Sequence, residues 1–377
     1  MKKIAIIGLL ALSVAALAGC GLQNVNQRQA AKEPVKIGFI GAMTGQFTKY
    51  GSYQAVQLAI DDINKNGGIN GAQVKLIAED GKCDPSTAVT AMNKLIDVDQ
   101  VKVVLGGHCT PESNAIAPVA EINKVIMLAA ISASPALTNM GDYIFRTSPV
   151  ATVQSTMDAT LAYNKLGLRK MAIIYEQTDY ARPIAEKMKE EFSRLGGKVA
   201  VYESYNPGVI DFRTILTKAK DNQVDSIFIS PQSPDAGFNL MKQIREMKIK
   251  AALFGNDVAG IQANIDKDPA MYEGFILSSP DFNPENPKTK DFIDEYNSKY
   301  NTKDLPYGFW TAESYDGAML IADAIAKNGL DVEKIKQYLY NVKNYEGVSG
   351  KISIDSNGDG IREYVTKVVK NGKMVNY

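Results

Sequence analysis

The sequence predicts an α/β protein made of two similar units, each a parallel sheet covered by helices. Segments typical of strands and of helices alternate at short intervals, and this alternation stops and starts again near residues 146–154. The chain has 377 residues, of which 45% are hydrophobic, so it is long enough to bury two cores. Such alternation is typical of doubly wound parallel sheets, whose ligands bind at the carboxyl ends of the strands.

The first unit begins with buried-type strands separated by amphipathic helices. Residues 53–68 repeat apolar side chains at helical spacing and stop at Gly67 and Gly68, which is a helix-ending pattern. By the same criteria we expect strands over 34–45, 72–81, 101–107 and 125–133, and further helices over 86–100 and 113–124.

The second unit repeats this order after residue 168. We expect strands over 169–179, 198–208, 224–234 and 251–257, and helices between them over 182–197, 212–223 and 236–249. Beyond this unit, residues 288–300 and the segment 305–329 have helical patterns.

The C-terminal segment, residues 350–377, has the pattern of a hairpin in which the turn DSNGDG joins 351–354 to 363–369. Asp355, Asn357, Asp359 and Gly360 also match the first half of a calcium-binding loop, but Thr366 stands where that loop needs its closing Glu. A Gly/Asn/Asp turn explains the same residues without a metal, and we favour the turn.

The N-terminal segment has the features of a secretory signal. Lys2 and Lys3 precede a short apolar run, which ends in small residues before Cys20. The ending LAGC resembles the lipobox of bacterial lipoproteins, which implies acylation of Cys20 as the first residue of the mature chain; an ordinary cleaved signal is the alternative. We therefore expect a lipoprotein signal peptide over 1–19, a flexible tether over 20–33, and a chain exported and anchored by lipid to the bacterial membrane, facing the periplasm or the exterior.

The two remaining cysteines, Cys83 and Cys109, form an even pair in a chain expected outside the cytoplasm, where thiols tend to be oxidised. We predict a disulfide between them. Because Cys109 follows His108, the only histidine, a nucleophile or a metal site is also conceivable. The nucleophile would need a base and an orienting group, and the metal would need more His or Cys ligands than the chain offers.

Composition and motifs argue against several classes of function. The 42 basic and 42 acidic residues balance, which gives no reason to expect nucleic acid as a partner. Apart from the signal, no apolar run is long enough to span a bilayer. A lipid-anchored hydrolase should show a GxSxG or HExxH motif, and neither occurs. We expect a monomer without catalytic residues, metal or cofactor.

Several long segments resemble the leucine/isoleucine/valine-binding protein and its relatives, the extracytoplasmic solute-binding subunits of ABC transporters. The resemblance lies in residues 40–96, in GGHCTPESNAIAPVAE, in SASPALTN and in YIFRTSP. It implies a type I periplasmic-binding-protein fold, in which two α/β lobes are joined by three crossovers and close on a ligand. The lobes would comprise 34–150 with 281–358, and 151–280 with 359–377. The family's disulfide also matches the pair Cys83 and Cys109.

The resemblance further implies two loops that bind the carboxylate of the ligand. Thr110 matches a hydroxyl position of the family, next to Cys109, and a helix N-terminus there would offer free N–H groups. Capping of that helix is the alternative role for Thr110. In the second loop Ala133 stands where leucine-type proteins have threonine, so Ser132 or Ser134 would supply the hydroxyl.

The other end of the ligand would meet residues of both lobes. Asp257 matches the acidic position that pairs with the ligand amine, where the family commonly has Glu. Gln232 stands at a position that is Tyr in the family, a change that would admit a more polar ligand. The aromatic walls implied by the resemblance are Tyr50, Tyr180, Phe309 and Trp310.

We conclude from the sequence that the chain is a lipoprotein that binds an amino acid and presents it to ABC permease subunits. A branched-chain aliphatic ligand is expected. The same fold binding another small carboxylate or an amide, or acting as a sensory receptor, is the alternative.

Overall fold

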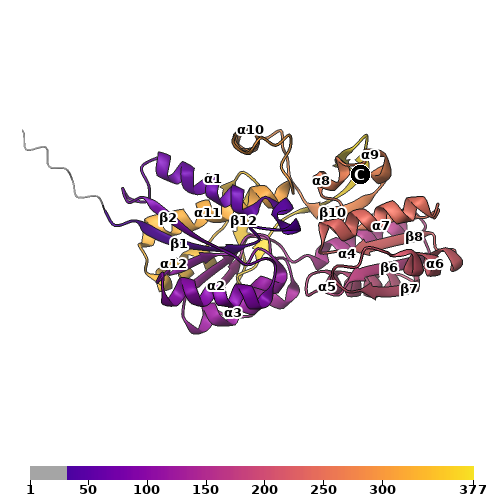
Figure 1. Ribbon diagram of the computed structural model, residues 1–377, viewed down its shortest axis with the longest axis horizontal. Coiled ribbons are helices and arrows are strands. Elements are labelled where there is room, and N and C mark those ends of the chain that lie inside the picture. Colours follow the sequence, from indigo (N-terminus) through magenta and orange to yellow (C-terminus); the bar gives the residue numbers. More distant parts are fainter. Residues whose placement is uncertain (1–31) are drawn as a thin grey trace, which may run out of the picture. The chain divides into compact units, whose positions relative to one another are not determined.

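Two sheets organise residues Glu33–Tyr377, which form one unit in the computed structural model (Figure 1). The structure describes residues 32–377, so the predicted signal peptide, Cys20 and nearly all of the predicted tether lie outside the described residues. Among the described residues, no helix combines the length and the apolar character that a membrane span requires.

The first sheet has the strand order β2-β1-β3-β4-β5, and all of its strands are parallel. Its strands are β1 (Val35–Gly41), β2 (Val74–Asp80), β3 (Val103–Leu105), β4 (Ile126–Ala129) and β5 (Ile144–Arg146). The central strands are buried on both faces, which explains why they read as continuous apolar runs.

Side chains of the first sheet alternate between two helical layers. Phe39 and Leu128 pack with one layer, whereas Ile40 and Met127 pack with the other. The first layer consists of α1 (Ser52–Lys65), α11 (Phe309–Asn328) and α12 (Val332–Tyr340). The second layer consists of α2 (Pro85–Asp97) and α3 (Thr110–Ile122). The expected doubly wound arrangement is confirmed.

The second sheet has the order β15-β14-β10-β9-β8-β6-β7, in which β6 to β10 are parallel and β14 and β15 are antiparallel additions. Its strands are β6 (Lys170–Glu176), β7 (Lys198–Tyr205), β8 (Ser226–Ser230), β9 (Ala252–Gly255), β10 (Ile276–Pro280), β14 (Tyr364–Lys370) and β15 (Lys373–Asn376).

The second sheet is also covered by helices on both faces. One face packs on α4 (Thr152–Thr160), its π-helical continuation η3 (Leu161–Lys165) and α5 (Ala181–Arg194). The other face packs on α6 (Arg213–Asp221), α7 (Pro234–Glu246), α8 (Gln262–Ile265) and α9 (Pro269–Tyr272).

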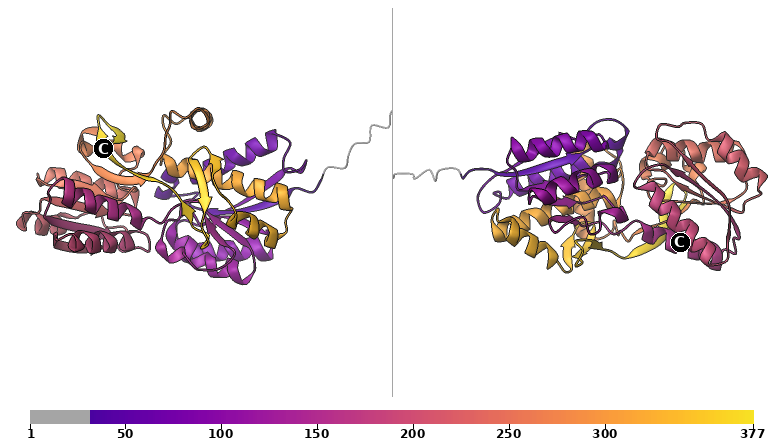
Figure 2. Two further views of the ribbon diagram at one scale, coloured as in Figure 1. Left: turned by 180° about the vertical axis from the view of Figure 1, so that it is seen from behind. Right: turned by 90° about the horizontal axis from the view of Figure 1, so that it is seen from below.

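The chain passes between the two sheets three times. It leaves β5 for α4, leaves β10 for α10 (Pro287–Tyr300), and returns to the second sheet after a small sheet of β11 (Tyr345–Gly347), β12 (Gly350–Ile354) and β13 (Gly360–Ile361). Figure 2 shows the yellow C-terminal segment making this last passage.

The predicted hairpin between residues 351–354 and 363–369 is wrong. The turn after β12 brings Gly360–Ile361 back onto β12, and the chain then crosses to the second sheet, where β14 pairs with β10 and β15. The two apolar runs thus belong to different sheets.

Candidate functional site

The residues expected to bind a ligand lie in loops that follow parallel strands of both sheets, or at the start of α11. All of them are buried, with at most 7% of their surface exposed: Tyr50, Cys109, Thr110, Ser132, Ala133, Ser134, Tyr180, Gln232, Asp257, Phe309 and Trp310. Tyr50 ends the 3-10 helix η1 (Gln46–Tyr50), and the Ser132–Ser134 loop leads into a second one, η2 (Pro135–Leu137). The carboxyl ends of the strands therefore meet where this fold class places its ligands.

Direct contacts join the loops of the two sheets. The Tyr50 hydroxyl donates to the backbone oxygen of Gln232 at 2.8 Å, and Lys49 forms an ion pair with Asp235. On another part of the same boundary, the Ser134 hydroxyl lies 3.4 Å from the backbone oxygen of Asp179. The candidate residues from both sheets are thus brought together in one place.

Aromatic rings form one wall of the candidate site. Tyr50 stacks on Tyr307 with ring centroids 5.0 Å apart, and Tyr307 lies 6.0 Å from Trp310. Phe309 meets Trp310 edge to face at 5.0 Å. Sequence reasoning missed Tyr307, although the aromatic run from Tyr307 to Trp310 was a signal that could have found it.

Asp257 is a buried carboxylate beside this wall. The Tyr180 hydroxyl donates to it, and the backbone N–H of Asp257 donates to Gln154 Oε1 at 3.2 Å. Burial raises the pKa of Asp257, although hydrogen bonds from Tyr180 and Tyr307 oppose that shift. Within residues 32–377, no Lys or Arg nitrogen lies within 4.0 Å of this carboxylate. A group carrying positive charge would complement it.

A cavity of about 180 Å³ adjoins Asp257 and Tyr307. Its remaining walls are mostly apolar and consist of Gly260, Ile261, Gln262, Leu277, Ser279, Phe282, Pro284, Gly308, Phe309, Trp310, Lys367 and Met374. Apolar walls with a few polar groups are typical of sites for small molecules.

Three successive carbonyl groups of the Ser132–Ser134 loop are bound by residues 146–151, a segment that begins with the last residue of β5. The pairs are Ser132 O with Ser148 Oγ at 2.9 Å, Ala133 O with the N–H of Ala151 at 2.8 Å, and Ser134 O with Arg146 Nη1 at 2.6 Å. The loop is therefore held from one side through its backbone acceptors.

The donors of this loop are unengaged. Among the described residues, the backbone N–H groups of Ser132–Ser134 have no hydrogen-bond acceptor. The Thr110 hydroxyl lies 3.5 Å from the Ser132 hydroxyl, and the N-cap of α3 is Cys109 rather than Thr110. Two hydroxyls, free N–H groups and the positive end of a helix dipole together form an arrangement that favours an anion.

Cys83 and Cys109 are joined by a disulfide, with their Cα atoms 5.3 Å apart. Glu112 supports both ends of this bridge, because its carboxylate accepts the backbone N–H of Cys83 at 2.8 Å and of Cys109 at 3.0 Å. The N–H of Cys109 is therefore used within the protein. In the described part of the chain, no three His, Cys, Asp or Glu side chains group as metal ligands.

Gln232 presents a buried amide to the same region. Its backbone N–H donates to Glu176 at 2.7 Å, and its side-chain nitrogen lies 3.7 Å from Cys83 Sγ. The side-chain oxygen has no hydrogen-bond partner among the described residues. A buried acceptor without a partner is costly, so this atom favours a ligand that carries a donor.

Comparison with known proteins relates nearly the whole described chain to one family. A family model described as periplasmic binding protein matches residues 34–373. A leucine-, isoleucine-, valine-, threonine- and alanine-binding protein of Pseudomonas aeruginosa is 29% identical over 333 residues, covering 87% of this chain and 88% of that protein.

Two solved structures agree with the fold described above. A leucine-binding protein from Thermotoga maritima has a TM-score of 0.83 at 28% identity, with 91% of this chain and 97% of that chain covered. A branched-chain amino acid transporter substrate-binding protein from Streptococcus pneumoniae, in complex with isoleucine, also has a TM-score of 0.83, at 26% identity, with 90% and 97% covered.

Proposed function

Because this chain belongs to the periplasmic binding protein family, we propose that it captures an amino acid between two lobes and delivers it to the permease of an ABC transporter. One observation carries the proposal: the buried carboxylate of Asp257, which has no Lys or Arg nitrogen within 4.0 Å among residues 32–377, lies in the same group of packed loops as the unengaged N–H groups of Ser132–Ser134. An amino acid carries an ammonium and a carboxylate, which complement these two features. The names of the similar proteins support the same ligand class.

Each end of the ligand is assigned to particular residues in this proposal. Asp257, with the hydroxyls of Tyr180 and Tyr307, receives the ammonium. Thr110 and the Ser132–Ser134 loop receive the carboxylate. A cavity of about 180 Å³ with apolar walls suits a branched aliphatic side chain. Phe309 and Trp310 line that cavity. Tyr50, which stacks on Tyr307 and donates to Gln232 O, connects Gln232 to the same region.

Closure of two lobes on the ligand is part of the proposal. We assign 34–150 with 281–358 to one lobe and 151–280 with 359–377 to the other. The division of strands β1 to β5 and β6 to β10 between two sheets supports this assignment, and the hydrogen bond from Tyr50 to Gln232 supports direct contact between the lobes.

Substitution of Asp257 tests the assignment of the ammonium. Asp257→Asn keeps the shape but removes the charge, and loss of one partner of a buried ion pair costs about 3 to 5 kcal/mol, or about two to four orders of magnitude in affinity. Thr110→Val should cost less, about 1 to 3 kcal/mol, because the N–H donors remain. Calorimetric titration with leucine, isoleucine, valine, threonine and alanine measures both effects.

Asp158→Asn is the matched control for that experiment. Asp158 is also a buried carboxyl group, in helix α4, and its hydrogen-bond partner is Ser278, which is not among the residues assigned to the ligand. Its substitution should leave affinity unchanged. If Asp257→Asn binds as tightly as the parent protein, the ligand has no ammonium at this position, and a small carboxylic acid becomes the better assignment.

We also propose that a lipid on Cys20 anchors the mature protein to the membrane, facing the periplasm or the exterior. The charged start, the short apolar run and the LAGC ending support this. Cys20→Ser should move the protein from the membrane fraction to the supernatant, and an unchanged distribution after fractionation would refute the anchor.

A further inference from the structure

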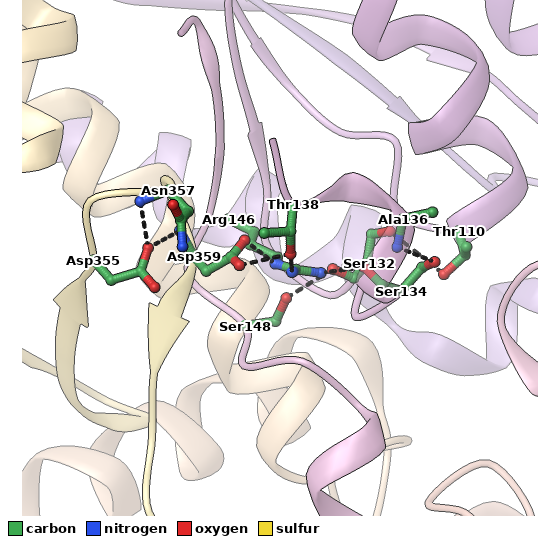
Figure 3. A network of polar contacts seen from close by, with 10 residues as sticks. All are labelled: Thr110, Ser132, Ser134, Ala136, Thr138, Arg146, Ser148, Asp355, Asn357 and Asp359. Carbon is green, nitrogen blue, oxygen red and sulfur yellow. Dashed lines mark hydrogen bonds and ion pairs between the residues drawn. The ribbon is translucent and has the colours of Figure 1, made fainter. Parts of the chain in front are cut away.

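Arg146 is a fully buried arginine that holds the carboxylate loop of the proposed site. It ends β5, and 1% of its surface is exposed. Its Nη1 donates to Ser134 O at 2.6 Å, its Nη2 donates to the Thr138 hydroxyl at 2.7 Å, and its Nε donates to Asp359 at 2.7 Å. All three contacts are drawn in Figure 3. One guanidinium therefore binds both ends of the loop that runs from Ser134 to Thr138.

Asp359 completes this network from a distant part of the chain. One of its carboxylate oxygens accepts from Arg146, and the other accepts from the Thr138 hydroxyl at 2.7 Å. A buried guanidinium without an anion would be strongly unfavourable, so Asp359 supplies the charge that keeps Arg146 in place. The three side chains form a closed set of hydrogen bonds, which we call the Arg146 clamp.

The clamp is built on two of the three passages between the sheets. Arg146 begins the first passage, and Asp359 lies in the turn that precedes the last one. The backbone N–H of Arg146 donates to Gly358 O at 2.9 Å. A Cβ at Gly360 would lie 1.9 Å from Thr147 O, so only glycine permits the two segments to lie this close. The position of Asp359 is thereby tied to the first passage.

The turn that carries Asp359 is held by its own hydrogen bonds. Asp355 Oδ1 accepts the backbone N–H of Asn357 at 2.8 Å and of Asp359 at 2.9 Å (Figure 3). This arrangement presents the Asp359 side chain to Arg146, and it makes the turn part of the support of the loop.

We infer that Arg146 and Asp359 are positioning residues for the carboxylate of the ligand. Arg146 holds the Ser132–Ser134 loop at the Ser134 carbonyl, and Asp359 holds Arg146. The N–H groups of the loop thereby stay available, and the position of the loop depends on the connections between the lobes. The inference rests on the proposed function for the identity of the ligand. The support of the loop itself can be tested without any ligand.

Two substitutions weaken the clamp in different ways. Arg146→Lys keeps the charge but cannot make all three contacts, and Thr138→Val removes the hydroxyl while leaving the ion pair intact. Arg245→Lys is the matched control, because Arg245 also binds two backbone oxygens, Met271 O at 2.8 Å and Glu273 O at 2.9 Å, far from the loop in sequence. Circular dichroism and thermal melts establish that each variant folds.

Hydrogen exchange of the ligand-free protein is the first measurement. The backbone N–H of Ala151 donates to Ala133 O and that of Leu137 to Ser134 O, so both report on the loop. Their exchange should accelerate by about tenfold or more in Arg146→Lys and Thr138→Val, as expected for the loss of hydrogen bonds to a charged group. The control should not change it. Unchanged exchange in both clamp variants overturns the inference.

Ligand preference is the second measurement. The affinities for leucine and for leucinamide, in which a neutral amide replaces the carboxylate, are compared by calorimetry. The clamp variants should lose about tenfold in the preference for leucine, because the carboxylate donors are displaced. A general loss of structure around the site would weaken the binding of leucine and leucinamide equally, and that result would count against a positioning role for the clamp. If the parent protein binds no amino acid, the proposed function fails, and the exchange measurement still decides the role of the clamp.

Discussion

His108, the only histidine, is a neutral residue of the core. It is 3% exposed, its ring lies 4.8 Å from that of Phe39, and its Nδ1 lies 3.1 Å from Ile40 O. Burial lowers the pKa of His108 to about 4, although the hydrogen bond to Ile40 opposes the shift. The neighbouring Cys109 is bound in a disulfide, so the pair offers neither a free thiol nor a charged imidazole.

This environment predicts a clear dependence on pH. In the unfolded chain His108 protonates near 6.5, but in the folded protein near 4. Its contribution to stability is therefore fully present above pH 6.5 and is lost as the pH falls towards 4, by about 3 kcal/mol in total. Burial raises the pKa of Glu112 to about 7, so Glu112 changes the overall stability in the opposite direction over the same pH range. NMR of the single imidazole avoids this overlap, because it measures the pKa of His108 directly. A resonance that titrates near pH 6.5 in the folded protein would contradict the prediction.

Helix α4 shows why some elements are not predicted from the sequence. Its buried face includes Gln154, Ser155 and Asp158, each at most 1% exposed. Methods based on apolar periodicity look for hydrophobic side chains at these positions, and here the buried positions are polar. These side chains are tolerated because their neighbours bind them: the Ser155 hydroxyl, for example, donates to Ile184 O at 2.8 Å.

Asp158 gives this helix a testable property. Its Oδ1 accepts from the Ser278 hydroxyl at 2.6 Å, and its Oδ2 has no partner among the described residues. Burial raises the pKa of Asp158 to about 8 despite the bond from Ser278. The folded-state pKa thus exceeds the unfolded value, so the stabilising contribution is present below pH 4 and is lost as the pH rises through 8.

Chemical denaturation of the parent protein and of Asp158→Asn across this range measures the effect. Between pH 5 and pH 9, the unfolding free energy of Asp158→Asn should increase relative to that of the parent protein by more than about 2 kcal/mol. Because other titrating groups are common to both proteins, they cancel in the difference. A difference that is constant with pH would show that Asp158 does not change its protonation on folding.

For the whole molecule, the sequence predicted the repeated order of strands and helices because each element obeys a local pattern. The alternation of Ile37, Phe39 and Ile40 between two helical layers follows directly from the period of a strand. The ion pair between Arg146 and Asp359 joins residues 213 apart in the sequence, and no local pattern reports such a contact. The turn around Asp359 was recognised as a turn, but its role as the counter-ion of a buried arginine depends on the assembled fold.

The candidate site was predictable to a similar extent. The loops after β1, β3, β4, β6, β8 and β9 were expected from the fold class, and the structure brings their residues together. Tyr307 was not anticipated, and neither were the N–H groups of Ser132–Ser134 that have no acceptor among the described residues. Whether a backbone N–H finds an acceptor depends on the position of every neighbouring carbonyl group, which the sequence does not give. Whether these residues bind the ligand stays a prediction.

The hydrogen bond from Tyr50 to Gln232 affects how efficiently the protein supplies ligand to a transporter. A neutral hydrogen bond contributes about 0.5 to 1.5 kcal/mol, and the exposed ion pair of Lys49 and Asp235 about 0 to 1 kcal/mol. In the proposed closure of the two lobes, contacts within the protein favour the closed state and so increase the apparent affinity for the ligand, because fewer empty molecules must first be converted to that state. The same energy raises the number of closed but empty molecules that compete for a transporter. Scavenging at low supply and rapid turnover at high supply therefore place opposite demands on these few contacts.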